Sequence, residues 1–339
     1  MQSFDFYLLS LYNDYMRIAI NGFGRIGRVF LKQALSNPDF EIVSINDLAD
    51  KENLLYLLEH DSVYGKFPLP EKIKDIKFLQ EKEPAKLPWK DLDIDIVVES
   101  TGFFDSYDKA KAHLDAGAKR VVVTAPIKDD LTLTFTPNVY SGDVSKFKIT
   151  SNASCTTNAI TPLISILAKN PGIKKAVLNT IHAYTASQGI VDKPDAKDWR
   201  RGRAGTIDIS PSSTGAAISA AKAIPEMKGI FDGVAVRVPV PVGSLIDLTF
   251  VAKRYTSVEE INEILTAESQ KPEWRGIIKV SSEQLVSTDI IGEPYGSIVD
   301  LGFTKVIDGD LVKIFSWYDN EWGYAAMLIR HIESLKNYL

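Results

Sequence analysis

The sequence RIAINGFGRIGR, residues 17–28, decides the fold class of this chain. Its first five residues form a short apolar run typical of a buried strand, and the next six match G-x-G-x-x-G. Apolar residues then recur at helical spacing through residues 26–35. A second apolar run, FEIVSIND at residues 40–47, ends in Asp47, at the separation of about 20 residues from the last glycine that this motif requires. Together these features are the fingerprint of a dinucleotide-binding unit.

Each residue of the fingerprint has a physical role. Gly22 permits the tight turn, Gly24 lets the backbone approach a pyrophosphate, and Gly27 lets the helix pack closely on the strand. The helix N-terminus offers free N–H groups to phosphates. The Asp47 carboxylate can accept hydrogen bonds from the adenosine ribose and would repel a 2′-phosphate. We therefore expect NAD as the cofactor, in preference to NADP.

The chain changes character near residue 150. Before it, short apolar strands alternate with helices, a pattern of parallel sheets covered on both faces. After it, longer strands alternate polar and apolar residues, which favours a mostly antiparallel sheet. We predict an α/β protein with a Rossmann-type parallel-sheet domain and an α+β catalytic domain. The predicted boundaries are 16–154 for the NAD-binding domain, which the C-terminal helix at 324–339 joins, and 155–323 for the catalytic domain.

Composition excludes several classes of protein. The 339 residues are 45% hydrophobic with a net charge of −5, so no global basic field attracts nucleic acid, which we do not expect as the main partner. No apolar run is long enough to cross a membrane, and we expect no membrane partner. The single cysteine excludes an intrachain disulfide and suits a reducing compartment, so we expect a cytoplasmic protein without a bound metal. Residues 1–15 are interpreted as an extension outside the fold.

That cysteine lies in SNASCTTNA, residues 151–159. Cys155 is either an inert thiol at the start of a core helix, or a nucleophile whose pKa the helix N-terminus lowers. Ser151 or Ser154 would cap the helix, and Pro162 predicts a kink or a second helix start. His182 ends an apolar strand where a long polar loop, 183–206, begins, and it could pair with Cys155. These residues alone leave both interpretations of the cysteine open.

The other histidines receive simpler interpretations. His60 ends a predicted helix, where its charge suits the helix dipole. His113 and His331 lie on predicted helices, and we expect both at the surface.

Three motifs taken together resemble those of phosphorylating glyceraldehyde-3-phosphate dehydrogenases: GFGRIGR at 22–28, SNASCTTNA at 151–159 and WYDNEWGY at 317–324. The resemblance covers residues 16–339. It implies that Cys155 is the nucleophile and that His182, in HAYT, is its base. It also implies a homotetramer in which the loop 183–206 contacts the cofactor region of a neighbouring subunit.

The resemblance also implies further site residues. The cofactor would be held by Gly22, Gly24, Arg25, Ile26, Gly27, Asp47, Lys82, Thr101, Thr124, Asn320 and Tyr324. Among these, Asn320 would hold the nicotinamide carboxamide. The substrate phosphate would be bound by Thr185, Arg201 and Arg237. The attacking inorganic phosphate would be bound by Ser154, Thr156, Thr214 and Gly215.

Two departures from the family pattern concern the cofactor. Lys193 occupies a position of cofactor selectivity and could admit NADP, and Lys82 stands where the family has an adenine-side arginine. The implied reaction is the oxidation of D-glyceraldehyde 3-phosphate to 1,3-bisphosphoglycerate through a thioester on Cys155, in glycolysis or gluconeogenesis. The alternative is an erythrose-4-phosphate dehydrogenase, which shares the motifs but fits Thr214 and Gly215 less well. A thiol redox sensor or a nucleic-acid-binding protein is a further alternative, which the net charge and the set of anion-binding residues disfavour.

Overall fold

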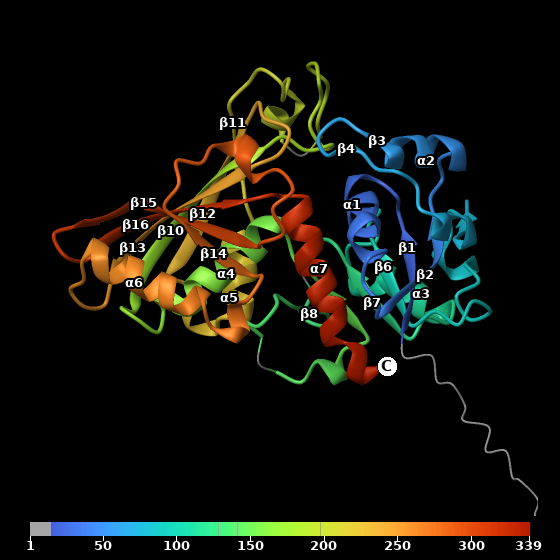
Figure 1. Ribbon diagram of the computed structural model, residues 1–339, viewed down its shortest axis with the longest axis horizontal. Helices are drawn as coiled ribbons and strands as arrows, with labels where there is room; N and C mark the ends of the chain where they lie inside the picture. Colours follow the sequence, from blue (N-terminus) through green and yellow to red (C-terminus); the bar gives the residue numbers. More distant parts are fainter. Residues whose placement is uncertain (1–14, 128, 141, 197) are drawn as a thin grey trace, which may run out of the picture.

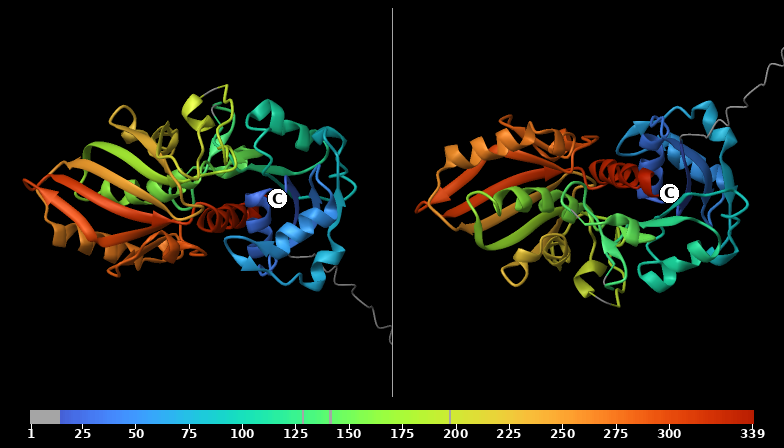
Figure 2. Two further views of the ribbon diagram at one scale, coloured as in Figure 1. Left: turned by 90° about the horizontal axis from the view of Figure 1, so that it is seen from above. Right: turned by 90° about the horizontal axis from the view of Figure 1, so that it is seen from below.

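The computed structural model describes residues 15–127, 129–140, 142–196 and 198–339. Two seven-stranded sheets lie at opposite ends of the molecule, and one helix runs between them (Figures 1 and 2). The expected N-terminal extension lies outside the described residues, apart from Tyr15.

The first sheet is entirely parallel. Its strands, in spatial order, are β5 (Lys77–Leu79), β2 (Phe40–Asn46), β1 (Met16–Asn21), β6 (Ile96–Glu99), β7 (Arg120–Val123), β9 (Ile149–Ser151) and β8 (Leu133–Thr134). Successive side chains of a strand point to opposite faces. Ile18 and Ile20 accordingly join the core under α1 (Arg25–Ala34), whereas Ala19 joins the core under α3 (Tyr107–Asp115). This is the doubly covered sheet that the apolar strands predict.

The second sheet is mostly antiparallel. Its strands, in spatial order, are β11 (Ser210–Ser213), β12 (Phe231–Val238), β10 (Ile173–Ala183), β13 (Ser244–Ala252), β16 (Leu311–Tyr318), β15 (Ser297–Ile307) and β14 (Ile278–Ser281). Only the pairs β10–β12 and β14–β15 are parallel. One face is covered by α4 (Cys155–Leu167), α5 (Ala216–Ala223) and α6 (Val258–Ser269). The predicted fold class is confirmed.

Short elements complete the described chain. These are α2 (Lys51–Glu59), the hairpin strands β3 (His60–Asp61) and β4 (Gly65–Lys66), and the 3₁₀ turns η1 (Glu71–Asp75), η2 (Pro84–Lys86), η3 (Val144–Lys146), η4 (Trp199–Gly202), η5 (Pro225–Met227), η6 (Pro272–Trp274), η7 (Ser287–Ile290) and η8 (Lys336–Tyr338). Within the described residues, no helix has the length and apolar character needed to cross a bilayer.

The last long helix, α7 (Trp322–Ser334), belongs to both halves of the molecule. It packs against α1 and against α4 (Figure 1). Ala325 and Leu328 join the core of the first sheet, while Met327 joins the core of the second. The helix therefore lies between the two sheets and contributes to the hydrophobic core of each.

Three details differ from the sequence expectations. α4 continues through Pro162, so no second helix begins there. His113 and His331 are fully buried, and the expectation that they lie at the surface is wrong. Both rings are buried because each has hydrogen-bonding partners in the interior, from strands or loops distant in the sequence.

Candidate active site

The glycine-rich turn has the geometry that a dinucleotide requires. Gly22 has a φ of +94°, and a Cβ atom there would lie 2.6 Å from the backbone nitrogen of Thr101. A Cβ on Gly27 would lie 2.3 Å from the Gly22 carbonyl oxygen, so both glycines are required by close packing. A Cβ on Gly24 would instead meet open space. The side chain missing at Gly24 therefore leaves room for a ligand at the N-terminus of α1.

A cavity of about 570 Å³ opens beside this turn. Asp47 lines it, and its carboxylate accepts hydrogen bonds from the backbone N–H of Phe23 at 2.7 Å and of Ala49 at 2.9 Å. The rest of the lining is Asn21, Gly22, Gly24, Asn46, Leu48, Glu81, Lys82, Ser100, Thr101, Phe103 and Phe104. The shape, the turn and the acidic rim fit the NAD that the sequence predicts.

A buried carboxylate that the sequence analysis did not identify lies below this cavity. Glu99, at the end of β6, accepts hydrogen bonds from the Asn21 amide at 2.6 Å and from the Thr101 backbone N–H at 2.8 Å. The Glu99 oxygen that accepts from Asn21 also lies 3.0 Å from His113 Nε2, and Trp89 Nε1 donates to His113 Nδ1 at 3.0 Å. Because Trp89 occupies Nδ1 as a donor, the proton of the neutral ring lies on Nε2 and points to Glu99. The sequence feature that could have identified this site is an acidic residue, Glu99, at the end of an apolar strand.

The side chain of Arg25 is held by ion pairs within the protein. Its guanidinium forms ion pairs with Asp61, at 3.0 Å, and with Glu321. Although burial acts to raise it, the pKa of Asp61 is lowered by hydrogen bonds from the next loop and from Arg25. The Arg25 backbone N–H remains the group that this residue can offer to a pyrophosphate.

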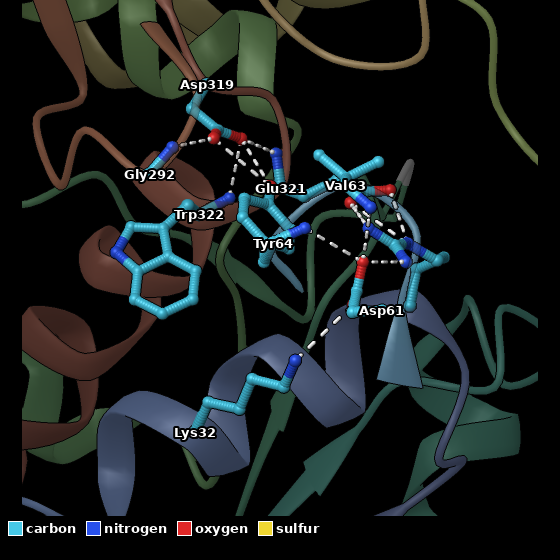
Figure 3. Close-up of polar contacts among 9 residues, drawn as sticks. Lys32, Asp61, Val63, Tyr64, Gly292, Asp319, Glu321 and Trp322 are labelled. Atoms are coloured by element: carbon cyan, nitrogen blue, oxygen red, sulfur yellow. Dashed lines mark hydrogen bonds and ion pairs between the residues drawn. The ribbon is translucent and has the colours of Figure 1, made fainter. Parts of the chain in front are cut away.

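The turn that carries Asn320 is fixed on both sides. Asp319 accepts hydrogen bonds from the backbone N–H of Trp322 at 2.7 Å and of Gly292 at 2.8 Å, and from the Tyr64 hydroxyl at 2.9 Å (Figure 3). Burial raises the pKa of Asp319. Asn320 itself accepts a hydrogen bond from the Ser244 hydroxyl at 2.9 Å.

The structure brings Cys155 and His182 together. Cys155 is the first residue of α4, and Ser154 caps this helix by accepting a hydrogen bond from the Thr157 backbone N–H at 3.1 Å. His182 is the penultimate residue of β10, and its Nε2 atom lies 3.3 Å from Cys155 Sγ. A thiol at a helix N-terminus and an imidazole within hydrogen-bonding reach form the arrangement that activates a cysteine nucleophile.

The other ring nitrogen of His182, Nδ1, lies close to one hydrogen-bond acceptor and one hydrogen-bond donor. Nδ1 lies 2.6 Å from the Ala183 carbonyl oxygen and 2.7 Å from an Arg237 guanidinium nitrogen. Burial and the Arg237 charge lower the pKa of His182 to about 3, and burial raises the pKa of the Cys155 thiol. In the unliganded chain the neutral thiol–imidazole pair is therefore favoured over the thiolate–imidazolium pair.

The remaining residues predicted to bind phosphate differ in their burial and in their hydrogen-bonding partners. Arg237 is paired in register with His182 across β12 and β10, and the Arg201 charge reaches both residues. The Arg201 guanidinium donates to the Ser212 hydroxyl at 3.1 Å. Thr156 is buried, with its hydroxyl 2.9 Å from that of Tyr318. The other contacts are Thr185 with the Ser187 hydroxyl, Thr214 with the Ala216 backbone N–H, and Gly215 at the N-cap of α5.

The last predicted cofactor residues complete the description. Thr101 and Lys82 both line the cavity. Ile26 lies in the first turn of α1, and Thr124 follows β7 directly. Tyr324 is buried, and its hydroxyl donates to the Ala153 carbonyl at 3.2 Å.

A doubly covered parallel sheet with this glycine turn, joined to an α+β unit that brings Cys155 and His182 together, defines the class of NAD-binding enzymes with a cysteine and a histidine in contact. Residues 16–107 match the family model described as glyceraldehyde 3-phosphate dehydrogenase, NAD binding domain, and residues 154–320 match the model of its C-terminal domain. The chain belongs to the glyceraldehyde-3-phosphate dehydrogenase family.

Curated relatives cover nearly the whole chain. The glyceraldehyde-3-phosphate dehydrogenase of Mycolicibacterium smegmatis is 46% identical over 331 residues, which are 92% of this chain and 96% of the relative. That of Mycobacterium avium is 45% identical over 331 residues, covering 93% and 96%. Glyceraldehyde-3-phosphate dehydrogenase 2 of Streptomyces arenae is 45% identical over 325 residues, with the same coverage.

Proposed function

We propose that the protein catalyses the phosphorylating oxidation of D-glyceraldehyde 3-phosphate to 1,3-bisphosphoglycerate with NAD⁺ and inorganic phosphate. The observation that carries the proposal is the 3.3 Å contact between His182 Nε2 and the thiol of Cys155, the only cysteine of the chain. The similarity to curated dehydrogenases of this name supports the choice of substrate.

The cofactor site supplies binding and orientation. The N-terminus of α1, with Gly22 and Gly24, would hold the pyrophosphate, Asp47 the ribose, and Asn320 the nicotinamide carboxamide. When bound, NAD⁺ supplies the acceptor for a hydride. The ion pairs of Arg25 and the hydrogen bonds of Asp319 keep the glycine turn and the Asn320 turn in place before the cofactor arrives.

Cys155 and His182 perform the covalent chemistry. His182 Nε2 takes the thiol proton, and the Cys155 sulfur attacks the aldehyde carbon. The oxyanion that forms takes this proton back from His182, which gives the hemithioacetal hydroxyl and a neutral imidazole. His182 then takes the hydroxyl proton of this adduct as the hydride leaves its carbon, which becomes a thioester. Inorganic phosphate attacks the thioester carbonyl, the carbon–sulfur bond breaks, and the thiolate of Cys155 is released with the acyl phosphate product.

Arg237 connects substrate binding to the base. A guanidinium binds phosphate through two parallel charge-assisted hydrogen bonds, and we assign the substrate phosphate to Arg237, Arg201 and Thr185. The same guanidinium lowers the pKa of His182 in the unliganded chain. A phosphate dianion on Arg237 offsets its charge, so the substrate itself makes His182 a stronger base. Ser154, Thr156, Thr214 and Gly215 are assigned to the inorganic phosphate.

The exposed apolar residues support association of subunits, for which we propose the homotetramer that the family resemblance implies. Ile190, Val191, Trp199, Ile207 and Ile209 in and beside the loop 183–206 are each at least 70% exposed. Val177 and Val234 are more than half exposed on the uncovered face of the second sheet. Large apolar side chains left this exposed are typical of surfaces that a partner subunit covers. The reaction places the protein in glycolysis or gluconeogenesis, in the cytoplasm.

Initial rates of NADH formation test the proposal. D-Glyceraldehyde 3-phosphate and D-erythrose 4-phosphate are compared, each with and without inorganic phosphate, and NADP⁺ replaces NAD⁺ in a parallel series. We expect phosphate-dependent turnover of the triose phosphate with NAD⁺. Faster, phosphate-independent turnover of the tetrose phosphate would identify the erythrose-4-phosphate dehydrogenase instead. Absence of activity with both aldehydes would refute the proposal.

A further inference from the structure

The turn that precedes the nucleophile holds a conformation that its sequence does not favour. Ala153 has a φ of +53°, in the left-handed region that residues with a Cβ rarely adopt. Ala153 is followed directly by the helix cap Ser154 and by Cys155. The direction in which α4 starts, and with it the position of the thiol, therefore depends on contacts that hold Ala153 in this conformation.

Several backbone groups of this turn are held by hydrogen bonds to β7, to the start of α4 and within the turn itself. The Asn152 N–H donates to the Val123 carbonyl at 2.9 Å, and the Asn152 carbonyl accepts from the Asn158 amide at 2.7 Å. The Ala153 N–H donates to the Ser151 hydroxyl at 3.0 Å. The Ala153 carbonyl is different, because its donor is the Tyr324 hydroxyl of α7, at 3.2 Å and fully buried. A distant helix thus contacts the strained residue itself.

The same helix makes a second contact one residue earlier. His331 Nδ1 lies 3.2 Å from the Asn152 side-chain oxygen, and its Nε2 lies 2.9 Å from the Thr150 hydroxyl. Burial lowers the pKa of His331 to about 3, so the ring is neutral. An amide oxygen only accepts hydrogen bonds, so Nδ1 carries the proton and Nε2 accepts from Thr150. The ring also stacks on Phe135, with centroids 4.3 Å apart.

We propose that Tyr324 and His331 are positioning residues that hold the left-handed turn at Asn152 and Ala153 and thereby keep Cys155 within reach of His182. The inference rests on the proposed role of Cys155 as nucleophile. α7 begins two residues after Asn320, so one helix extends from the turn assigned to the nicotinamide to the turn that positions the thiol.

Alkylation of Cys155 by iodoacetamide tests the inference, because the chain contains no other cysteine. The rate at neutral pH depends on the base next to the thiol, whereas the rate at high pH reports the free thiolate. In Tyr324→Phe we expect the neutral-to-alkaline rate ratio to fall about 3- to 10-fold, as for the loss of one hydrogen bond. We expect kcat to fall by a similar factor.

A second substitution separates positioning from general damage. Glycine adopts a positive φ without strain, so Ala153→Gly in the Tyr324→Phe background should restore at least half of the lost ratio. Tyr255→Phe, at a tyrosine that is 78% exposed, is the matched control. The inference is overturned if Tyr324→Phe leaves the ratio unchanged, if the double variant is no faster than the single one, or if the alkaline rate falls equally.

Two variants of His331 test the positioning role independently, and they can be used if Tyr324→Phe does not fold. His331→Leu removes both hydrogen bonds and should lower the rate ratio, whereas His331→Gln retains a donor and an acceptor and should keep it nearer to the wild type. Equal ratios in the two variants would contradict the role of His331. Turnover that persists in Cys155→Ala would refute the proposed nucleophile, but it would leave these alkylation results to decide the positioning question.

Discussion

The substitution Arg237→Gln tests how one arginine serves both substrate and base. Glutamine removes the charge but keeps a polar side chain on β12. In the structure, one guanidinium nitrogen donates to the Ala183 carbonyl at 2.9 Å and lies 2.7 Å from His182 Nδ1. If Arg237 also binds the substrate phosphate, the variant loses two effects, and two substrates can separate them.

The loss of phosphate binding should be large. Each hydrogen bond to a charged group contributes about 1.5–3 kcal/mol, and a guanidinium can make two to a phosphate. Because Arg201 and the new amide retain part of the interaction, we take about 3 kcal/mol, which corresponds to a loss of roughly 100-fold in kcat/KM. With D-glyceraldehyde, which lacks the phosphate, we expect a loss of less than about fivefold. Arg237→Lys, which keeps the charge without the fork, should lie between.

The pH dependence should also change in a defined direction. The Arg237 charge contributes to lowering the pKa of His182 to about 3, so its removal raises this pKa toward the ordinary 6.5, although burial still opposes protonation. A base loses its function below its own pKa, so the acid limb of kcat/KM for D-glyceraldehyde should move to higher pH in Arg237→Gln. The assay is NADH formation between about pH 5 and 9 with both aldehydes.

Two results would refute this reasoning. An equal loss with both aldehydes would show that Arg237 does not bind the substrate phosphate. An acid limb that stays in place would show that the Arg237 charge does not influence His182 during turnover.

The remaining predictions concern the nucleophile, the cofactor and stability. Cys155→Ala should abolish NADH formation and leave the Kd for NAD⁺, measured by calorimetry, within about twofold of the wild-type value. Phosphate-dependent turnover in this variant would refute the assignment of Cys155 as the nucleophile. Asp47→Asn removes the charge that disfavours a 2′-phosphate, so the ratio of kcat/KM for NADP⁺ to that for NAD⁺ should rise about tenfold, and an unchanged ratio would contradict the role of this carboxylate. Asp61→Asn leaves the buried ammonium of Lys32 unpaired and should lower the free energy of unfolding in urea by about 3–5 kcal/mol, whereas Asp192→Asn at an exposed ion pair should cost less than about 1 kcal/mol. Because the pKa of Asp61 is lowered in the fold, the stability that its carboxylate contributes is present above the ordinary aspartate pKa and is lost as the pH falls. If Asp61→Asn and Asp192→Asn lowered the free energy of unfolding equally, the buried pairing of Asp61 with Lys32 would be contradicted.

Residues whose role depends on local chain geometry were predictable from the sequence. The glycine turn and Asp47 lie at fixed offsets along one βαβ unit, so the pattern alone predicts how they meet. The contact between Cys155 and His182 was only one of two open interpretations. It depends on how β10 packs beside the start of α4, and no spacing in the sequence specifies that packing.

Residues whose partners are distant in the sequence were not predictable. His113 looked like a surface residue because its own helix shows no reason to bury it, and its partners Trp89 and Glu99 lie on other elements. His331 contacts a turn about 180 residues earlier in the chain. Arg25 stays a predicted cofactor residue through its backbone N–H, but the ion pairs of its guanidinium with acids from two other segments were not foreseen. In each case the decisive contact is tertiary, and a polar residue in a helix carries no local signal of it.

The place of α7 at the end of the chain has a consequence during synthesis. Residues of this helix complete the apolar core of the first sheet, which is translated first. Until α7 has emerged from the ribosome, one face of that sheet lacks part of its cover, and the nascent nucleotide-binding half exposes hydrophobic side chains. Truncations that remove α7 should therefore destabilise this half of the molecule, and ribosome-bound intermediates that lack α7 should be ligands for chaperones that recognise exposed apolar segments.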